Sequence, residues 1–200
     1  MSAAPANFTS GARSGIHVVV KRVAARVVVL TALLSVALPG TAEEPPYTCE
    51  PNVVLGRAMA PVLERIAADF HRRTGRRLHV TSGTRTPEEQ AEAMFDKLAR
   101  GERLTSLYRD VDAASEIQAA YRRHRRDGRA VAVREMARVI RAQVGRGCLI
   151  SRHLDANAVD VRSRNLSRRE QAVLREVVRS AGNVELLQEG VPPHFHLQLR

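Results

Sequence analysis

Hydrophobic residues change their spacing repeatedly along this chain, and most of the changes follow a glycine. Helical spacing predicts helices over residues 53–73, 86–100, 110–126, 130–144 and 167–180. Alternating spacing predicts strands over residues 78–80, 158–161, 184–188 and 194–199. The last two strands are joined by only a short turn, so we expect them to pair in an antiparallel fashion. This order of elements predicts an α+β domain, with a small antiparallel sheet flanked by several helices.

The first 42 residues have the three parts of an export signal. Basic residues come first, an apolar stretch follows over residues 27–38, and small residues stand at Gly40 and Ala42. We therefore predict a cleaved signal peptide at 1–42, a flexible leading segment at 43–52 and one domain at 53–200. An uncleaved membrane anchor is the alternative, although the apolar stretch is short for a membrane span. The mature protein is then exported, to a periplasm or out of the cell, with no membrane span.

The formal net charge is +11, with 32 Lys and Arg against 21 Asp and Glu. Outside the cytoplasm the abundant anionic polymers are those of the cell wall and envelope, so positive charge is expected to concentrate the protein there. Solubility alone is the alternative explanation, because the arginines are spread along the predicted helices. We expect no nucleic-acid partner, and we expect a monomer.

Two cysteines, Cys49 and Cys148, lie in the predicted mature chain. An even number of cysteines in an oxidising compartment predicts a disulfide between them. Two free structural cysteines are the alternative. The two positions lack the close spacing of a cysteine pair that binds zinc.

Polar residues near the C-terminal end have the types and the order of a catalytic zinc site. His194 and His196 flank Phe195 on a predicted strand, so both imidazoles face the same way and Phe195 faces the core. His153 and Asp160 frame a turn that leads into another predicted strand. A catalytic zinc ion takes three protein ligands, often two histidines and one carboxylate, and keeps one position open. We therefore predict His153, Asp160 and His196 as the ligands of one Zn²⁺.

A hydrolytic metal site also needs a group that stabilises the developing negative charge. A bound zinc ion acidifies a coordinated water and polarises the carbonyl group of the bond that is cut. A basic side chain is then needed beside the oxyanion. Arg85 follows the predicted strand at 78–80 and is our candidate for this role.

Three motifs around these residues follow one another in a set order. They are Ser82-Gly83-Thr84-Arg85, Ser151-x-His153-x-x-Ala156-x-Ala158-x-Asp160 and His194-Phe195-His196. In the same order they resemble an SGYR-like turn, the signature SxHxxGxAxD and a final His-x-His, which together mark the zinc D-Ala-D-Ala metallopeptidases. That family shares its fold with lysostaphin-type enzymes and with the Hedgehog signalling domain. The resemblance covers the chain from about residue 80 to its C-terminus, but residues 104–144 match nothing in the family.

The resemblance implies a function as well as a site. It implies that His153, Asp160 and His196 bind zinc, that Arg85 supports the transition state and that Ser151 contacts the substrate. The implied reaction is hydrolysis of a peptide bond in peptidoglycan, by a D,D-carboxypeptidase or an endopeptidase.

The chain departs from the family pattern at two places. Ala156 stands where the signature has glycine, which matters if this position needs a positive φ. Many members also carry an acid three residues before a ligand histidine, where this chain has Val191 and Pro193. Glu189 and His194 are the alternative general bases. A module that keeps the zinc fold without catalysis, and a metal-free protein that binds envelope polymers through its basic surface, are the other two hypotheses.

Overall fold

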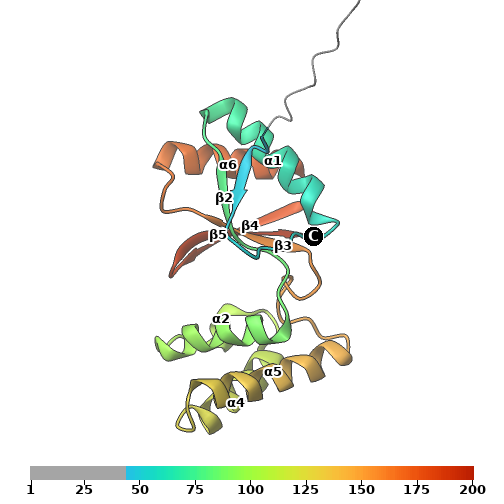
Figure 1. Ribbon diagram of the computed structural model, residues 1–200, viewed down its shortest axis with the longest axis vertical. Coiled ribbons are helices and arrows are strands. Elements are labelled where there is room, and N and C mark those ends of the chain that lie inside the picture. The colour runs from blue at the N-terminus through green and yellow to red at the C-terminus, as the bar shows by residue number, and fades with distance from the viewer. Residues whose placement is uncertain (1–43) are drawn as a thin grey trace, which may run out of the picture. The chain divides into compact units, whose positions relative to one another are not determined.

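The structure is a computed structural model that describes residues 44–200, and these residues form the predicted α+β fold (Figure 1). The strands are β1 (Tyr47–Cys49), β2 (Leu78–Ser82), β3 (Ala158–Arg162), β4 (Val184–Gly190) and β5 (Pro193–Leu199). The helices are α1 (Met59–Thr74), α2 (Pro87–Ala99), α3 (Leu104–Leu107), α4 (Val111–His124), α5 (Arg129–Gly145) and α6 (Arg168–Ala181). The predicted signal peptide at 1–42 lies outside the described residues.

The five strands form one small open sheet in the order β1-β2-β3-β5-β4. Strands β2, β3, β5 and β4 pair in an antiparallel fashion, as the sequence predicts. Strand β1 is parallel to β2, with Tyr47 beside Leu78, so the sheet is mixed rather than purely antiparallel. The leading segment at 43–52, which we expected to be flexible, therefore contributes an edge strand. Three residues are too few to show alternation, which is why the sequence pattern misses this strand.

Helices α1 and α6 cover one face of the sheet (Figure 1). Their apolar side chains and those of the strands form the first hydrophobic core, in which Phe70, Leu174 and Phe195 are fully buried. Burial of each such side chain contributes roughly 1.5–3 kcal/mol. Helix α1 begins at Met59 rather than at the predicted Val53, because the residues before it form a loop in which the carbonyl oxygen of Val54 accepts from the backbone N–H of Thr84.

Helices α2, α4 and α5 pack on one another on the other side of the sheet (Figure 1). They have a second core of their own, which includes Met94, Ile117 and Met136. The start of α2 is fixed by a capping box, in which Thr86 and Glu89 bond each other's backbone N–H groups. Because this helical layer has a core of its own, it does not pack tightly on the sheet. The polar face of the sheet therefore lines a cleft.

Alternation along the strands divides the side chains between these two sides. On β5, Phe195 and Leu197 enter the first core, while His194, His196 and Gln198 line the cleft. On β3, Val159 and Val161 enter the same core, and Asp160 between them lines the cleft. The two-residue period of a strand therefore collects the polar side chains on one face.

The predicted disulfide is not formed, since Cys49 and Cys148 are both free. Cys49 is exposed on the edge strand β1, whereas Cys148 packs against the second core of the helices. The thiol of Cys148 donates a hydrogen bond to Asp110 Oδ2 at 3.2 Å. The two cysteines thus belong to different layers of the fold, which an even count cannot reveal.

No helix within residues 44–200 combines the length and the apolar character that crossing a membrane requires.

Candidate metal centre

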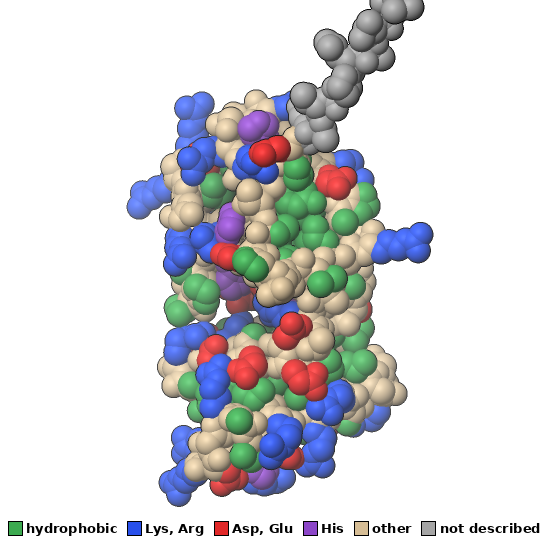
Figure 2. All heavy atoms as spheres, in the orientation of Figure 1, with side chains coloured by type: hydrophobic (Ala, Val, Ile, Leu, Met, Phe, Trp, Pro, Cys, Tyr) green, Lys and Arg blue, Asp and Glu red, His purple; other side chains and the backbone are tan. Residues whose placement is uncertain are grey.

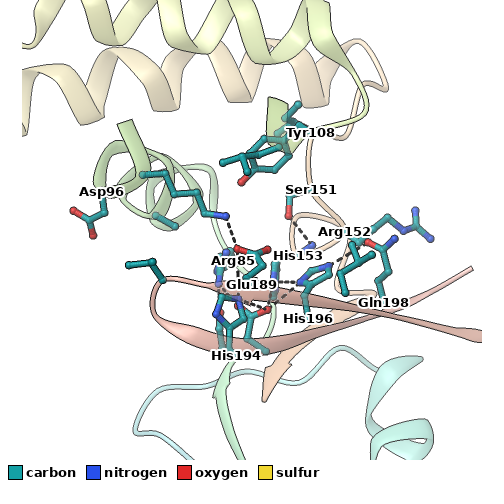
Figure 3. A pocket seen from close by; sticks show the side chains of 18 of the residues that line it. Arg85, Asp96, Tyr108, Ser151, Arg152, His153, Glu189, His194, His196 and Gln198 are labelled. Carbon is teal, nitrogen blue, oxygen red and sulfur yellow. Dashed lines mark hydrogen bonds and ion pairs between the residues drawn. The ribbon is translucent and has the colours of Figure 1, made fainter. Parts of the chain in front are cut away.

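His153, Asp160 and His196 come together in the cleft, as the sequence predicts. Figure 3 shows the two histidines beside each other. Asp160 on β3 and His196 on β5 are direct partners in the antiparallel register, and His153 comes from the turn before β3. One possible ligand atom from each residue lies within 4.8 Å of the others. All three residues are buried, with relative exposures of 2%, 4% and 7%. The group could therefore hold a metal ion.

Hydrogen bonds fix which nitrogen of His153 faces this centre. Nδ1 lies 2.6 Å from the carbonyl oxygen of Gly83. A carbonyl oxygen can only accept, so Nδ1 carries the hydrogen and Nε2 keeps its lone pair. Nε2 lies 3.2 Å from Asp160 Oδ1 and 3.1 Å from His196 Nδ1.

The orientation of His196 follows from a chain of three residues behind it. Glu185 accepts hydrogen bonds from Gln198 Nε2 at 2.8 Å and from Arg109 at 2.8 Å. The amide group of Gln198 is thereby oriented with Oε1 toward His196 Nε2, at 3.1 Å. Nε2 of His196 must then carry the hydrogen, which leaves the lone pair of Nδ1 directed at Asp160 Oδ1, 2.9 Å away.

Two imidazole lone pairs and a carboxylate oxygen therefore face one another in a buried space. Such an arrangement is repulsive unless a cation or a proton lies among the three atoms. The donor set of two nitrogens and one oxygen suits zinc and other divalent transition metals. The residues present thus fit a metal ion, and each ligand histidine has an outer hydrogen-bond partner of the kind that metal-binding histidines usually have.

Replacing Gln198 by leucine should weaken metal binding by about 10–100-fold, because the ring of His196 loses the partner that fixes its tautomer and orientation. The measurement is competition for Zn²⁺ between the full chain and a chromophoric chelator. Gln198→Glu keeps an acceptor at this position and serves as the conservative control. Equal zinc affinity of the leucine variant and the unchanged chain would show that the amide is not needed.

Arg85 occupies the other side of Asp160. Its Nη2 bonds Asp160 Oδ2, while Nε donates to Ser82 Oγ at 2.8 Å and Nη1 to Gln90 Oε1 at 3.3 Å. The guanidinium group is therefore held in place, and it binds the carboxylate oxygen that does not face the histidines. The sequence predicts Arg85 beside an oxyanion, and the structure adds this contact with Asp160.

The electrostatics of the centre keep Asp160 charged and His153 neutral. Burial alone raises the pKa of Asp160, but its close pairing with His153 and His196 and the positive charge of Arg85 hold that pKa well below its usual range. Burial lowers the pKa of His153, and this effect exceeds the opposing attraction of Asp160. A carboxylate and a neutral imidazole are the forms that bind a metal.

Close backbone approaches hold both the turn that carries His153 and the turn that follows β2. Ala156 has a φ of 61°, so the position where the family signature has glycine does need a positive φ. A Cβ atom at Gly56 would lie 1.7 Å from the carbonyl oxygen of Ala156. A Cβ atom at Gly83 would likewise lie 2.2 Å from the carbonyl oxygen of Val54. Glycine at these two positions lets the loop before α1 lie against the site.

His194 and Glu189, the two candidate bases, lie beside the centre (Figure 3). They are register partners on β5 and β4, so Glu189 belongs to a strand rather than to the predicted turn. His194 Nδ1 donates to the carbonyl oxygen of Pro192 at 2.6 Å. Its Nε2 therefore faces the cleft, 3.6 Å from Glu189 Oε2 and 3.7 Å from Asp160 Oδ1.

A lysine from the helical layer, Lys97 on α2, reaches Glu189 across the cleft. Its Nζ donates to Glu189 Oε2 at 2.5 Å and lies 5.6 Å from the ring centre of Tyr108. Burial raises the pKa of Glu189, but the hydrogen bond and charge of Lys97 lower it by more. The sequence gives no sign of this pair, since its members are 92 residues apart. Gln198, by contrast, could have been found, because it lies two residues after His196 on the same strand face.

The cleft is a cavity of about 510 Å³ between the sheet and the helical layer. It is lined by the metal-centre residues and by Arg85, Glu189 and His194. Ser151 also lines it, and its Oγ accepts from the backbone N–H of His153 at 3.4 Å. Figure 2 shows this hollow, with basic side chains and a histidine at its margin. All the predicted site residues other than the two cysteines therefore come together in one place.

Comparison of the chain with protein-family models, with curated proteins and with solved structures finds no match.

Proposed function

We propose that this protein is an exported zinc peptidase that hydrolyses peptide bonds of cell-wall peptidoglycan. The observation that carries the proposal is the buried group of His153, Asp160 and His196, with three lone-pair atoms facing one another at the floor of a cleft. The resemblance of the surrounding motifs to the zinc D-Ala-D-Ala metallopeptidases supplies the reaction class. The substrate peptide, the export and the monomeric state are parts of the same proposal.

Two residues beside the metal centre have separate roles in hydrolysis. Zinc, when bound, lowers the pKa of a coordinated water and polarises the substrate carbonyl group. His194 is the better-placed general base, because its Nε2 faces the cleft at 3.7 Å from Asp160 Oδ1. It accepts a proton from the attacking water and returns it to the leaving amine. Glu189 stabilises the imidazolium that forms, since its carboxylate lies 3.6 Å from Nε2.

Arg85 contacts Asp160 and the developing oxyanion, and Ser151 contacts the substrate. Three N–H groups of Arg85 are used by Asp160, Ser82 and Gln90, and two remain. These two N–H groups are available to an oxyanion, so Arg85 both orients Asp160 and stabilises the transition state. The hydroxyl of Ser151 lines the cleft and can bond a substrate amide.

A module that binds zinc and cell-wall or envelope polymers without catalysis is the second candidate. The observation in its favour is the pairing of Glu189 with Lys97 at 2.5 Å, which weakens this carboxylate as a base. The family's acid position is also occupied by Pro193. In that case the cleft retains its metal but turns over no peptide.

One experiment separates these readings. The full chain, purified without chelator, is analysed for zinc and then incubated with soluble peptidoglycan peptides. We expect about one zinc per chain and release of a new amine.

His194→Gln should keep the zinc and lose about 10²–10⁴-fold in kcat, the usual contribution of a general base. His124→Gln, at the end of α4, is the matched control. Zinc without any hydrolysis would favour the non-catalytic module, and no zinc uptake would reject both.

A further inference from the structure

Exposed apolar side chains gather around the mouth of the cleft. Within the described part of the chain seven large apolar side chains are exposed, and four of them line the cavity of the metal centre. Leu187 and Val191 come from β4 and the turn after it, and Leu107 and Leu149 come from the helical layer. Both walls of the cleft therefore present aliphatic surface beside the metal ligands. Single exposed apolar side chains are common on proteins, whereas a cluster with polar residues around it often marks a binding site.

The cleft also continues beyond His196. A second cavity, of about 570 Å³, shares Arg109, Arg152 and Gln198 with the first and extends to Leu199 and Arg200. The shared residues make the two cavities parts of one elongated groove. A bound chain can therefore lie across the metal centre and reach past Gln198.

Arginines dominate the far end of this groove. Arg109, Arg152 and Arg200 line it, and two carboxylates pair with them, Glu185 with Arg109 and Asp155 with Arg152. Glu185 is already bonded by Gln198 and by Arg109, and the side chain of Arg109 remains 85% exposed. Arg152 uses Nη1 for Asp155 and Nη2 for the carbonyl oxygen of Leu199, and Arg200 is exposed. The remaining guanidinium N–H groups favour a planar anion, and a carboxylate is the anion that a peptide offers.

We propose that the groove binds an extended peptide, with aliphatic side chains beside the metal centre and a carboxylate at the far end formed by Arg109, Arg152 and Arg200. The inference rests on the proposed function for the reaction, but the binding itself needs no catalysis. The carboxylate has two possible sources in a peptide, an acidic side chain within the chain or the C-terminus.

Four synthetic peptides distinguish these sources by equilibrium binding. Two are C-terminally amidated alanine peptides with an internal Glu or Gln, and two are alanine hexapeptides with a free or an amidated C-terminus. Binding to the full chain is measured by calorimetry after zinc is removed with a chelator, so that no peptide is cut. We expect at least one carboxylate peptide to bind about tenfold more tightly than its amide partner, since a charge-assisted hydrogen bond is lost in the amide.

Variants of the groove assign this preference to residues. Arg152→Gln and Arg200→Gln should each reduce the preference for the carboxylate peptide about threefold to tenfold and leave the binding of the amide peptide unchanged. Arg125→Gln, at the end of α4, is the control for a lost surface charge. Leu187→Ser should weaken all four peptides, whereas Val144→Ser, exposed on α5, should weaken none.

Equal binding of carboxylate and amide peptides, or the same loss for both in the arginine variants, would overturn the proposal. These outcomes are independent of the proposed function, because they are measured without zinc and without turnover. A preference for the internal Glu points to a substrate that continues through the groove, and a preference for the free C-terminus points to a chain end there. If the peptides bind as proposed but the protein takes up no zinc, the proposed peptidase function is rejected and the peptide-binding groove is retained.

Discussion

His153→Ala is expected to abolish zinc binding and peptide hydrolysis together. The substitution removes one of three ligand atoms and leaves Asp160 and His196 with too few donors for a tetrahedral catalytic site. A lost outer partner of a ligand histidine already costs about 10–100-fold in metal affinity, so loss of the ligand itself should cost more. Zinc per chain by elemental analysis and the rate of amine release from peptidoglycan peptides are the two measurements.

His79→Ala is the matched control for this variant. His79 lies on β2, where it bonds Thr48 and Glu50 away from the cleft. This variant should keep its zinc and its activity. A His153→Ala protein that still holds one zinc per chain and cuts the peptides would place the metal elsewhere and would contradict the site described above.

The elements that hold the site could be predicted because their signals are local. Phe195 between His194 and His196 already indicates that the two histidines share the face opposite the core, and the structure places Phe195 in that core. The capping residues Ser167 and Glu170 likewise indicate the start of α6, where the structure has both hydrogen bonds. Patterns with a period of two or of 3.6 residues are contained in a short segment, so one sequence is enough to detect them.

The parts that could not be predicted depend on contacts between distant segments. The ion pair of Lys97 and Glu189 joins a helix to a strand of the opposite layer. The edge strand β1 forms its ladder with β2, about 30 residues further along the chain. The disulfide was predicted from a count of cysteines, yet Cys49 and Cys148 lie in different layers. In each case the deciding interaction is tertiary, and no period in the sequence records it.

Arg85→Met is expected to destabilise the zinc-free protein more than the zinc-loaded protein. Arg85 binds the carboxylate of Asp160, whose side chain is only 6% exposed. Removing one partner of a buried ion pair costs about 3–5 kcal/mol, because the other charge stays buried. Bound zinc supplies a second positive partner for Asp160, so part of this loss should be recovered. Thermal unfolding of both proteins with and without Zn²⁺ measures the difference, and 1 kcal/mol corresponds to about 2–4 °C in Tm.

The same variant tests the catalytic role of Arg85. Loss of one group that stabilises an oxyanion reduces kcat by about 10²–10³-fold, and KM should change far less. Arg85→Lys keeps the charge but loses the planar guanidinium that reaches Asp160, Ser82 and Gln90 together, so it should recover stability better than turnover. If Arg85→Met loses stability but keeps its kcat, Arg85 only positions Asp160. A normal kcat together with normal unfolding temperatures would show that Arg85 does neither.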